Sequence, residues 1–335
     1  MKYGRIAQVD KPISRIVFGT AMPVMFAAFR SVYGDAPDFD QRLNAAFSLL
    51  DEMYACGVNC FDCADHYGEE PLGEWLEARG LHDKVVILDK GAHHNRWRTR
   101  INDFDILYDA HNSLAKLKAK RLDIYLLHRD DPSKAVGPIV DVLNRLHDEG
   151  KIGVFGASNW TVERIEAANE YAAKHGLQPF AASSPNYGLA VQVRDPWGGG
   201  CVTISGPDAR EDRRYYAEHR MPVFAYSTMA RGFFSGKLKS DAPERAGEVL
   251  DEAGMKGYFC PENMERLRRC EILAAEKGVS VAKIAMAWVF NHPELDVYAL
   301  TTTRSRARMM ECVEASEMAL SPTECAWLDL EIERR

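Results

Sequence analysis

Eight short runs rich in β-branched and other apolar residues recur along the chain, and segments with helical periodicity separate them. Several of the runs are almost continuously apolar, which is typical of parallel strands covered on both faces. Eight strands that alternate with helices predict a parallel sheet, and this number of strands favours closure into a (β/α)8 barrel. The expected strands are 15–20, 58–65, 84–91, 122–128, 152–159, 179–186, 222–228 and 296–303.

The segments between the strands carry apolar residues on one helical face. In the first of them, Leu43, Ala46 and Leu50 recur at helical spacing before a stop at Gly57. A doubly wound open sheet is the structural alternative, but it calls for a G-x-G-x-x-G turn after an early strand, and the sequence contains none. Further helices are expected over 70–80, 100–120, 135–149, 161–175, 262–276 and 280–291.

Two connections are longer than the few residues usual in such folds. Residues 188–212 follow the sixth strand and residues 229–261 follow the seventh. Both therefore follow the carboxyl ends of strands, where barrels of this kind carry their active sites. We expect these two segments to cover a cofactor and a substrate. Because no repeat or interdomain linker is evident, residues 1–335 are expected to form a single domain.

Composition excludes several classes of function. The chain of 335 residues has a net charge of −7, which argues against a nucleic-acid partner because phosphate backbones require a basic surface. No apolar run approaches the roughly 20 residues of a membrane span. The first fifteen residues carry charges throughout, so we expect no secretory signal. Eight scattered cysteines without a disulfide rhythm are typical of free thiols in a reducing cytoplasm.

Two residue pairs invite a metal or redox interpretation. His93 and His94 are adjacent, and adjacent histidines without a carboxylate or cysteine at ligand spacing rarely bind a metal. Cys60 and Cys63 form a C-x-x-C pair inside an expected strand, where positions i and i+3 point to opposite faces. We therefore expect neither a metal site nor a redox pair.

Four chemically active side chains lie at the ends of three consecutive expected strands. Asp62 ends the second strand and Tyr67 follows it, Lys90 ends the third strand, and His128 ends the fourth. Each alone has a structural explanation, as a capping carboxylate, a solvated ammonium or a structural imidazole. The carboxyl ends of barrel strands meet at one rim, so we expect the four side chains to form one catalytic set.

These four side chains together predict an acid catalyst. A phenol is a reluctant acid at neutral pH, and we expect the ammonium of Lys90 to lower the pKa of Tyr67 below its ordinary value. Asp62 supplies the counter-charge that a buried ammonium needs. A neutral His128 hydrogen-bonds the substrate oxygen. Such a set is suited to proton donation to a carbonyl oxygen as a hydride reaches the carbonyl carbon.

The segments that contain these residues resemble the aldo-keto reductase superfamily. GVNCFDCADHYG is similar to the family signature GxxxFDTAxxYG, and LDKGAH resembles the strand-three lysine segment. SLAKLKAKRLDIYLLHRDD, GKIGVFGASNW and VFAYSTMARGFFSGK resemble three further family motifs. The similarity runs from about residue 13 to 330, and the motifs keep the family's order.

The resemblance implies an N-terminal β-hairpin within residues 3–16, NADPH bound without a Rossmann domain, and the catalytic set given above. Three departures concern the cofactor: Ser184 occupies a usual glutamine position, Thr301 and Thr302 replace a Pro-Gly pair, and Cys312 occupies a usual asparagine position. Arginines at the start of an expected helix suit the 2′-phosphate of NADP. The matched cofactor-binding positions are Gly19, Thr20, Ser158, Asn159, Ser184, Tyr226, Ser227, Met229, Gly232, Lys237, Arg304, Ser305 and Arg308.

The expected function is NADPH-dependent reduction of an aldehyde or ketone by a cytoplasmic enzyme that acts on a small molecule. Trp97, Trp160 and Trp197 either pack under the long loops or line a substrate pocket, and aromatic walls of this kind would suit an aromatic or sugar-derived carbonyl compound. The same fold and cofactor also serve two alternatives: redox-assisted elimination or epimerisation of a sugar, and a non-catalytic cofactor-sensing subunit. A binding subunit has no need of Tyr67 or Lys90, which argues against the last.

Overall fold

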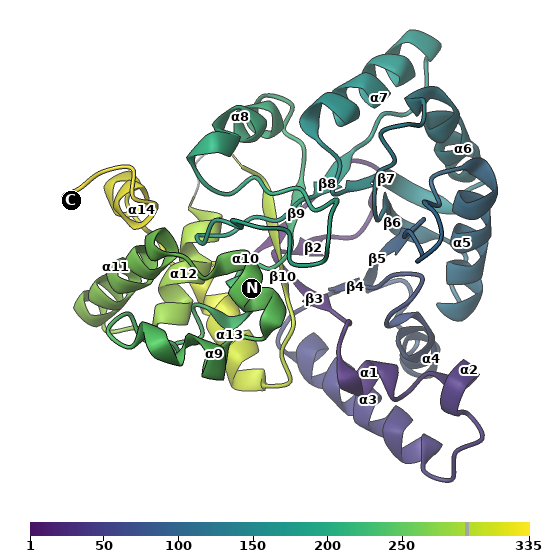
Figure 1. Ribbon diagram of the computed structural model, residues 1–335. Helices are drawn as coiled ribbons and strands as arrows, with labels where there is room; N and C mark the ends of the chain where they lie inside the picture. The colour runs from purple at the N-terminus through teal and green to yellow at the C-terminus, as the bar shows by residue number, and fades with distance from the viewer. Residues whose placement is uncertain (292–294) are drawn as a thin grey trace. The chain divides into compact units, whose positions relative to one another are not determined.

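The computed structural model describes residues 1–291 and 295–335 and has the alternating architecture expected from the sequence (Figure 1). Eight parallel strands close a barrel in the order β10-β3-β4-β5-β6-β7-β8-β9. The predicted (β/α)8 fold is therefore confirmed. The strands are β3 (Ile16–Gly19), β4 (Cys60–Asp62), β5 (Val86–Gly91), β6 (Leu122–Leu127), β7 (Ile152–Ser158), β8 (Ala182–Ser184), β9 (Val223–Ala225) and β10 (Val297–Thr301).

Within this barrel the chain divides into two compact units, which we describe one at a time. The first unit comprises Tyr3–Ser183 and Thr302–Arg306, and it contains β3 to β7. The second comprises Met1–Lys2, Ser184–Thr301 and Ala307–Arg335, and it contains β9 and β10. The expectation of a single domain stays a prediction. Across the described ranges, no helix combines the length and the apolar character that crossing a membrane requires.

The helices of the first unit alternate with its strands, and Figure 1 shows α5, α6 and α7 outside β5 to β7. Of the residues predicted on the apolar face of the first long helix, Ala46 and Leu50 of α3 are buried, whereas Leu43 is only partly buried. Asn102 caps α5 by accepting a hydrogen bond from the Asp105 amide. The helices are α1 (Pro23–Phe26), α2 (Arg30–Tyr33), α3 (Phe39–Ala55), α4 (Glu69–Arg79), α5 (Asp103–Lys116), α6 (Val136–Asp148) and α7 (Val162–His175).

A short antiparallel hairpin precedes the barrel strands, as the family resemblance implies. It consists of β1 (Tyr3–Gly4) and β2 (Ile13–Ser14). Between these strands, Lys11 extends its ammonium to the carbonyl oxygens of His82 and Val85, at 2.9 and 2.7 Å, and to Asp123 at 2.8 Å. Val85 directly precedes β5, and Asp123 is the second residue of β6. The hairpin is therefore tied to the amino ends of these two strands.

The second unit carries the two long connections, and both contain helices that the sequence analysis did not predict. Helix α8 buries only Arg213, Tyr215 and Tyr216, so its sequence REDRRYYAE shows no clear apolar face. The segment after β9 contains two further short helices instead of an irregular loop. The helices are α8 (Arg210–Glu218), α9 (Ala246–Val249), α10 (Glu252–Tyr258), α11 (Pro261–Lys277), α12 (Val281–Phe290), α13 (Arg306–Ala315), which begins at the last residue of the first unit, and α14 (Pro322–Leu328).

Candidate active site

The four predicted catalytic residues all lie in the first unit, at the carboxyl ends of three neighbouring strands. Asp62 is the last residue of β4, and Lys90 is the penultimate residue of β5. His128 follows β6, and its amide donates to the carbonyl of Gly91 at 2.9 Å, which extends the sheet ladder by one residue. Tyr67 lies just before α4. The parallel arrangement therefore brings the four side chains to one edge, as predicted.

A buried hydrogen-bonded triad forms the centre of this set. The Lys90 ammonium is paired with Asp62 Oδ1 and also donates to the Tyr67 hydroxyl oxygen at 3.1 Å. The Tyr67 hydroxyl in turn donates to Asp62 Oδ2 at 3.2 Å. Asp62 and Lys90 are each only 3% exposed and Tyr67 is 9% exposed. These contacts stabilise the folded site, because a buried charge without a partner has a large free-energy cost.

The expected effect of Lys90 on the acidity of Tyr67 is wrong in direction. Burial raises the pKa of Tyr67 well above 10, and the neighbouring Asp62 carboxylate raises it further. The ammonium of Lys90 is already engaged with Asp62, so its attraction for a phenolate does not offset burial. Tyr67 is consequently protonated at neutral pH and holds the proton that an acid catalyst must deliver.

His128 has the neutral form that the sequence analysis expected. Burial lowers its pKa well below 6.5, and the Lys90 ammonium lowers it further. The His128 ring lies edge-on to the Tyr67 ring, with centroids 6.1 Å apart. The pKa of Asp62 is raised by burial, while the charge of Lys90 opposes this effect. The set therefore combines a protonated phenol, a neutral imidazole and a paired ammonium.

A glycine fixes the backbone next to the phenol. Gly68 has φ +79°, and a Cβ there would lie 1.8 Å from Thr20 Oγ1. Thr20 follows β3 and is held by two hydrogen bonds to the Asp62 carbonyl, at 3.0 Å from its amide and 2.7 Å from its hydroxyl. Only glycine satisfies both the left-handed conformation and the close approach. Gly19 and Thr20 thus adjoin the strand end that carries Asp62.

Two other residues matched to cofactor binding also adjoin the catalytic set. Ser158 ends β7, and Asn159 follows it in a left-handed conformation with φ +60°. The Asn159 amide donates to Ser158 Oγ at 3.0 Å and to the His128 carbonyl at 3.3 Å. Arg304 and Ser305 belong to the same unit and precede α13.

The second unit holds the remaining matched positions. Ser184 ends β8, and its hydroxyl donates to the Phe224 carbonyl at 2.7 Å, so its proton is used within the fold. Tyr226 follows β9, and its ring centroid lies 6.1 Å from that of Trp197. The segment that follows has unusual backbone geometry, with φ +52° at Ser227 and +96° at Gly232. The other matched positions in this unit are Met229, Lys237 and Arg308.

The sequence profile of the aldo/keto reductase family matches residues 32–330, which is most of the chain. The chain belongs to this family. It is therefore an oxidoreductase of carbonyl or alcohol substrates, and the predicted family membership is confirmed.

Named relatives of this aldo/keto reductase span similar lengths. The probable aryl-alcohol dehydrogenase AAD4 of Saccharomyces cerevisiae is 26% identical over 309 residues, covering 85% of this chain and 86% of that protein. The aryl-alcohol dehydrogenase of Phanerodontia chrysosporium, whose name specifies NADP(+), is 25% identical over 309 residues, covering 85% and 75%. Among solved structures, the glycerol dehydrogenase AKR11B4 from Gluconobacter oxydans has the same fold, with a TM-score of 0.72 at 23% identity, covering 98% of this chain and 94% of that one.

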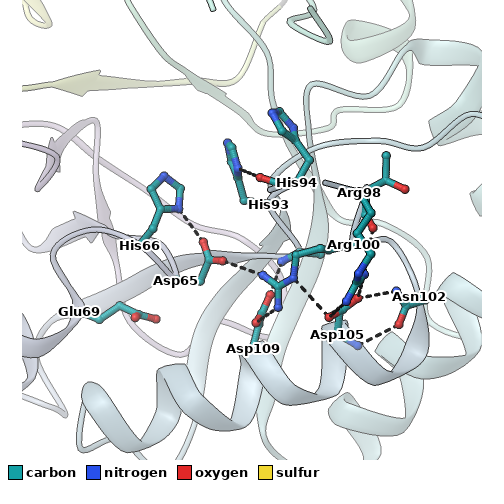
Figure 2. Close-up of polar contacts among 12 residues, drawn as sticks. Asp65, His66, Glu69, His93, His94, Arg98, Arg100, Asn102, Asp105 and Asp109 are labelled. Atoms are coloured by element: carbon teal, nitrogen blue, oxygen red, sulfur yellow. Dashed lines mark hydrogen bonds and ion pairs between the residues drawn. The ribbon is translucent and has the colours of Figure 1, made fainter. Parts of the chain in front are cut away.

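Histidine side chains of the first unit adjoin the catalytic set of this aldo/keto reductase, and the sequence analysis missed one of them. His66 immediately precedes Tyr67, and its Nδ1 is hydrogen-bonded to Asp65 Oδ1 at 2.7 Å (Figure 2). The ring centroids of His66 and His128 are 5.3 Å apart. Its place next to Tyr67 in the motif GVNCFDCADHYG was the available signal.

The loop after β5 is held in place by an ion-pair network, which Figure 2 shows. Arg100 is paired with Asp65 at 3.2 Å, with Asp109 at 2.6 Å and with Asp105 at 3.3 Å. Asp109 also accepts a hydrogen bond from the backbone amide of Ala92 at 2.8 Å. Ala92 is the first residue of the loop and has a left-handed conformation with φ +58°. The network thereby fixes the segment that carries His93 and His94.

The other aromatic and cysteine residues considered in the sequence lie partly in the core and partly at the surface. Trp160 is fully buried and donates to the Arg129 carbonyl at 3.0 Å, so it packs in the core and cannot contact a substrate. Trp97 is 75% exposed. Cys60 and Cys63 are buried free thiols, and burial raises the pKa of both well above 9, which disfavours the reactive thiolate.

A buried pair of carboxyl groups lies on the other side of the strand that carries Lys90. Asp89 is fully buried, and Cys63 Sγ donates to its Oδ1 at 3.3 Å. Across the described residues, no hydrogen bond reaches Asp89 Oδ2 or Glu69 Oε1. Burial raises the pKa of Asp89 well above its ordinary value, and the charge of Glu69 raises it further. Asp89 therefore costs stability in its ionised form.

Replacing Asp89 with asparagine is expected to stabilise the enzyme by about 1–3 kcal/mol at pH 8. Because the pKa of Asp89 is raised in the folded state, the unfolded chain releases this proton at a lower pH. The contribution of Asp89 to the stability of the wild type therefore falls as pH rises above about 4. Asparagine removes that loss. The measurement is the free energy of urea unfolding of both proteins at pH 4.5 and 8, and the stabilisation should be larger at pH 8.

The matched control is Asp105→Asn, which should have the opposite sign. The guanidinium of Arg98 lowers the pKa of Asp105 to about 2. Its contribution to stability is present above the unfolded-state pKa of about 3.9 and is lost only as pH falls toward about 2. Asp105→Asn should therefore destabilise the enzyme at both pH values. An Asp89→Asn variant less stable than the wild type at pH 8 would contradict the assignment.

Proposed function

We propose that this chain is an NADPH-dependent reductase of aldehydes or ketones in which Tyr67 donates the proton. The observation that supports this most strongly is the position of the Tyr67 hydroxyl, 3.1 Å from Lys90 Nζ and 3.2 Å from Asp62 Oδ2. A buried, protonated phenol at the carboxyl end of the barrel strands is a positioned general acid.

The residues of the triad have distinct tasks in this proposal. Tyr67 gives its proton to the carbonyl oxygen of the substrate and acquires negative charge as it does so. Lys90 donates to the Tyr67 oxygen, so its ammonium stabilises that charge as it develops. Asp62 supplies the counter-charge to the Lys90 ammonium, which is only 3% exposed. The neutral His128 is suited to hydrogen-bonding the same carbonyl oxygen and orienting it.

The residues matched to the family's cofactor positions have the donors that NADPH requires. NADPH, when bound, supplies the hydride that the carbonyl carbon receives. Ser158 and Asn159 offer a hydroxyl and an amide for the carboxamide group, and the aromatic ring of Tyr226 suits stacking on the nicotinamide. The backbone around Gly232, with φ +96°, leaves the chain open for close approach by a pyrophosphate. We also propose the following positions in cofactor binding: Gly19, Thr20, Ser184, Ser227, Met229 and Lys237.

Phosphate recognition favours NADPH over NADH. Arg304 and Arg308 are exposed, and Ser305 lies between them at the start of α13. Guanidinium groups bind phosphate in a forked geometry, and a helix amino end adds to the attraction. The relative from Phanerodontia chrysosporium whose name specifies NADP(+) agrees with this preference.

The named relatives direct the choice of substrate class. Two of them are called aryl-alcohol dehydrogenases, so we propose an aromatic aldehyde as the first candidate and a sugar-derived carbonyl compound as the second. We place the enzyme in the cytoplasm because its eight cysteines are free thiols.

The cofactor proposal is tested by fluorescence titration with NADPH and NADH. We expect NADPH to bind more tightly than NADH, and Arg308→Ala to weaken NADPH by about tenfold or more while leaving NADH unchanged. Arg210→Ala is the matched control, since Arg210 is an exposed arginine whose partner is Glu331. Equal loss of both nucleotides in Arg308→Ala would remove Arg308 from phosphate recognition. Failure of either nucleotide to bind the wild type would overturn the proposed function.

A further inference from the structure

Three imidazoles from three different segments of the first unit converge beside the catalytic set. His66 precedes Tyr67, His93 lies in the loop after β5, and His128 follows β6. One nitrogen of each ring lies within 4.8 Å of a nitrogen of each of the others. The ring centroids are 4.7 Å apart for His66 and His93, 4.7 Å for His93 and His128, and 5.3 Å for His66 and His128. We call these residues the histidine cluster.

The hydrogen bonds of two rings leave the same nitrogen available on each. His93 Nδ1 lies 2.7 Å from the His94 carbonyl oxygen, which can only accept, so Nδ1 carries the proton. His66 Nδ1 lies 2.7 Å from a carboxylate oxygen of Asp65 and donates in the same way. A neutral imidazole protonated at Nδ1 keeps its lone pair on Nε2. Both rings therefore present Nε2 as a free ligand atom.

The hydrogen bonds made by Nδ1 of His66 and His93 are of the kind that metal-binding histidines make. Metal-ligating histidines usually donate their other ring N–H to a carboxylate or a backbone carbonyl, which fixes the tautomer and the ring orientation. Asp65 provides a carboxylate for His66 and is itself held by Arg100 at 3.2 Å, as Figure 2 shows. The His94 carbonyl plays this part for His93. Each of these two ligands thus has an outer partner.

The third ring has an unused nitrogen. Nδ1 of His128 is buried, and among the residues that the structure describes no hydrogen bond reaches it. A buried polar nitrogen without a partner calls for an explanation.

We propose that His66, His93 and His128 form a three-histidine site for a divalent transition metal of the zinc class, and that an ion there inhibits the enzyme. Three nitrogen ligands with an open fourth position are a known arrangement for zinc. Tetrahedral ligands at bond lengths of 2.0–2.1 Å are separated by about 3.3 Å, so the rings close around the ion by small rotations, which the exposed His66 can make. The sequence predicted no metal site because His66 and His128 are far from His93 and His94 along the chain.

The charges around the cluster define what kind of site this is. The Lys90 ammonium is paired with Asp62, and Arg100 is paired with Asp65, so these charges largely balance. The positive charge of Arg129 also acts on both His93 and His128 and opposes a cation. We therefore expect a reversible site weaker than a structural zinc site. Inhibition rests on the proposed function, because the ion engages His128, which that function assigns to the substrate oxygen.

Binding is tested without any enzymatic activity, by titrating the purified protein with Co²⁺ and following the visible absorption of the bound ion. We expect one Co²⁺ per chain, displaced by Zn²⁺. His66→Ala and His93→Ala should each weaken binding more than about tenfold. His94→Ala is the matched control: it lies in the same loop, and its backbone carbonyl still accepts from His93. No visible absorption in the wild type, or equal loss of binding in His94→Ala, overturns the site.

Inhibition is tested separately, by measuring NADPH oxidation with a carbonyl substrate in the presence of Zn²⁺. We expect Zn²⁺ to compete with the carbonyl substrate and not with NADPH, and each variant is compared with its own rate without metal. His66→Ala should require more than about tenfold more Zn²⁺ for half inhibition. Co²⁺ binding without inhibition overturns the inhibitory role. A protein that binds Co²⁺ at the cluster but reduces no carbonyl compound confirms the metal site and overturns the proposed function.

Discussion

Tyr67→Phe should lower kcat for carbonyl reduction by about 10²–10⁴-fold, the usual contribution of a general acid. The ring is kept and only the hydroxyl is lost, so the packing against His66 and His128 remains. Affinity for NADPH should change less than twofold, because the proposed cofactor residues do not include Tyr67. The measurement is steady-state NADPH oxidation, together with fluorescence titration of the cofactor.

The matched control is Tyr125→Phe, which removes another buried tyrosine hydroxyl from the same unit. Tyr125 lies in β6, its hydroxyl is buried, and no hydrogen bond reaches it within the described part of the chain. A Cβ at Gly91 would lie 1.9 Å from that hydroxyl, so its position is fixed by packing alone. Tyr125→Phe should retain nearly full activity. Equal activity in Tyr67→Phe and the wild type would remove Tyr67 from proton transfer.

Lys90→Met is expected to abolish measurable turnover and to destabilise the fold by about 3–5 kcal/mol. Removing the ammonium leaves the Asp62 carboxylate buried without its counter-charge, and breaking a buried ion pair from one side has costs of this size. It also removes the donor 3.1 Å from the Tyr67 oxygen. The free energy of urea unfolding and kcat are both measured.

A double variant separates the two effects. In Lys90→Met with Asp62→Asn, no charge is left unpaired, so most of the lost stability should return. Activity should stay low, because no ammonium remains to stabilise negative charge on Tyr67. Recovery of activity along with stability would show that Lys90 has only a structural part.

The sequence predicted the fold and the convergence of Asp62, Tyr67, Lys90 and His128 for a physical reason. Strand periodicity is visible in a single chain, and the carboxyl ends of parallel barrel strands must share one edge. The helices α8 to α10 escaped prediction because their apolar residues are few and their segments are short or polar.

The pKa of Tyr67 could not be predicted, because it depends on how burial and the charges of Asp62 and Lys90 combine, and residue spacing does not reveal this. Residue types alone indicate that Lys90 and Tyr67 are neighbours, but they do not show that Asp62 already occupies the ammonium or how completely Tyr67 is buried. The histidine cluster was not predicted for a related reason. Its assembly depends on loop conformation, which the Arg100 network fixes through contacts distant in sequence.

The most direct test of the central claim is transfer of deuterium to benzaldehyde or glyceraldehyde from NADPH that carries deuterium at both C4 positions of the nicotinamide. These two compounds represent the aromatic and sugar-derived classes. The proposed reaction predicts an alcohol that carries one deuterium on the former carbonyl carbon, with one NADPH consumed for each alcohol formed. An alcohol without deuterium, or a rearranged sugar formed without net consumption of NADPH, would contradict carbonyl reduction as the function of this enzyme.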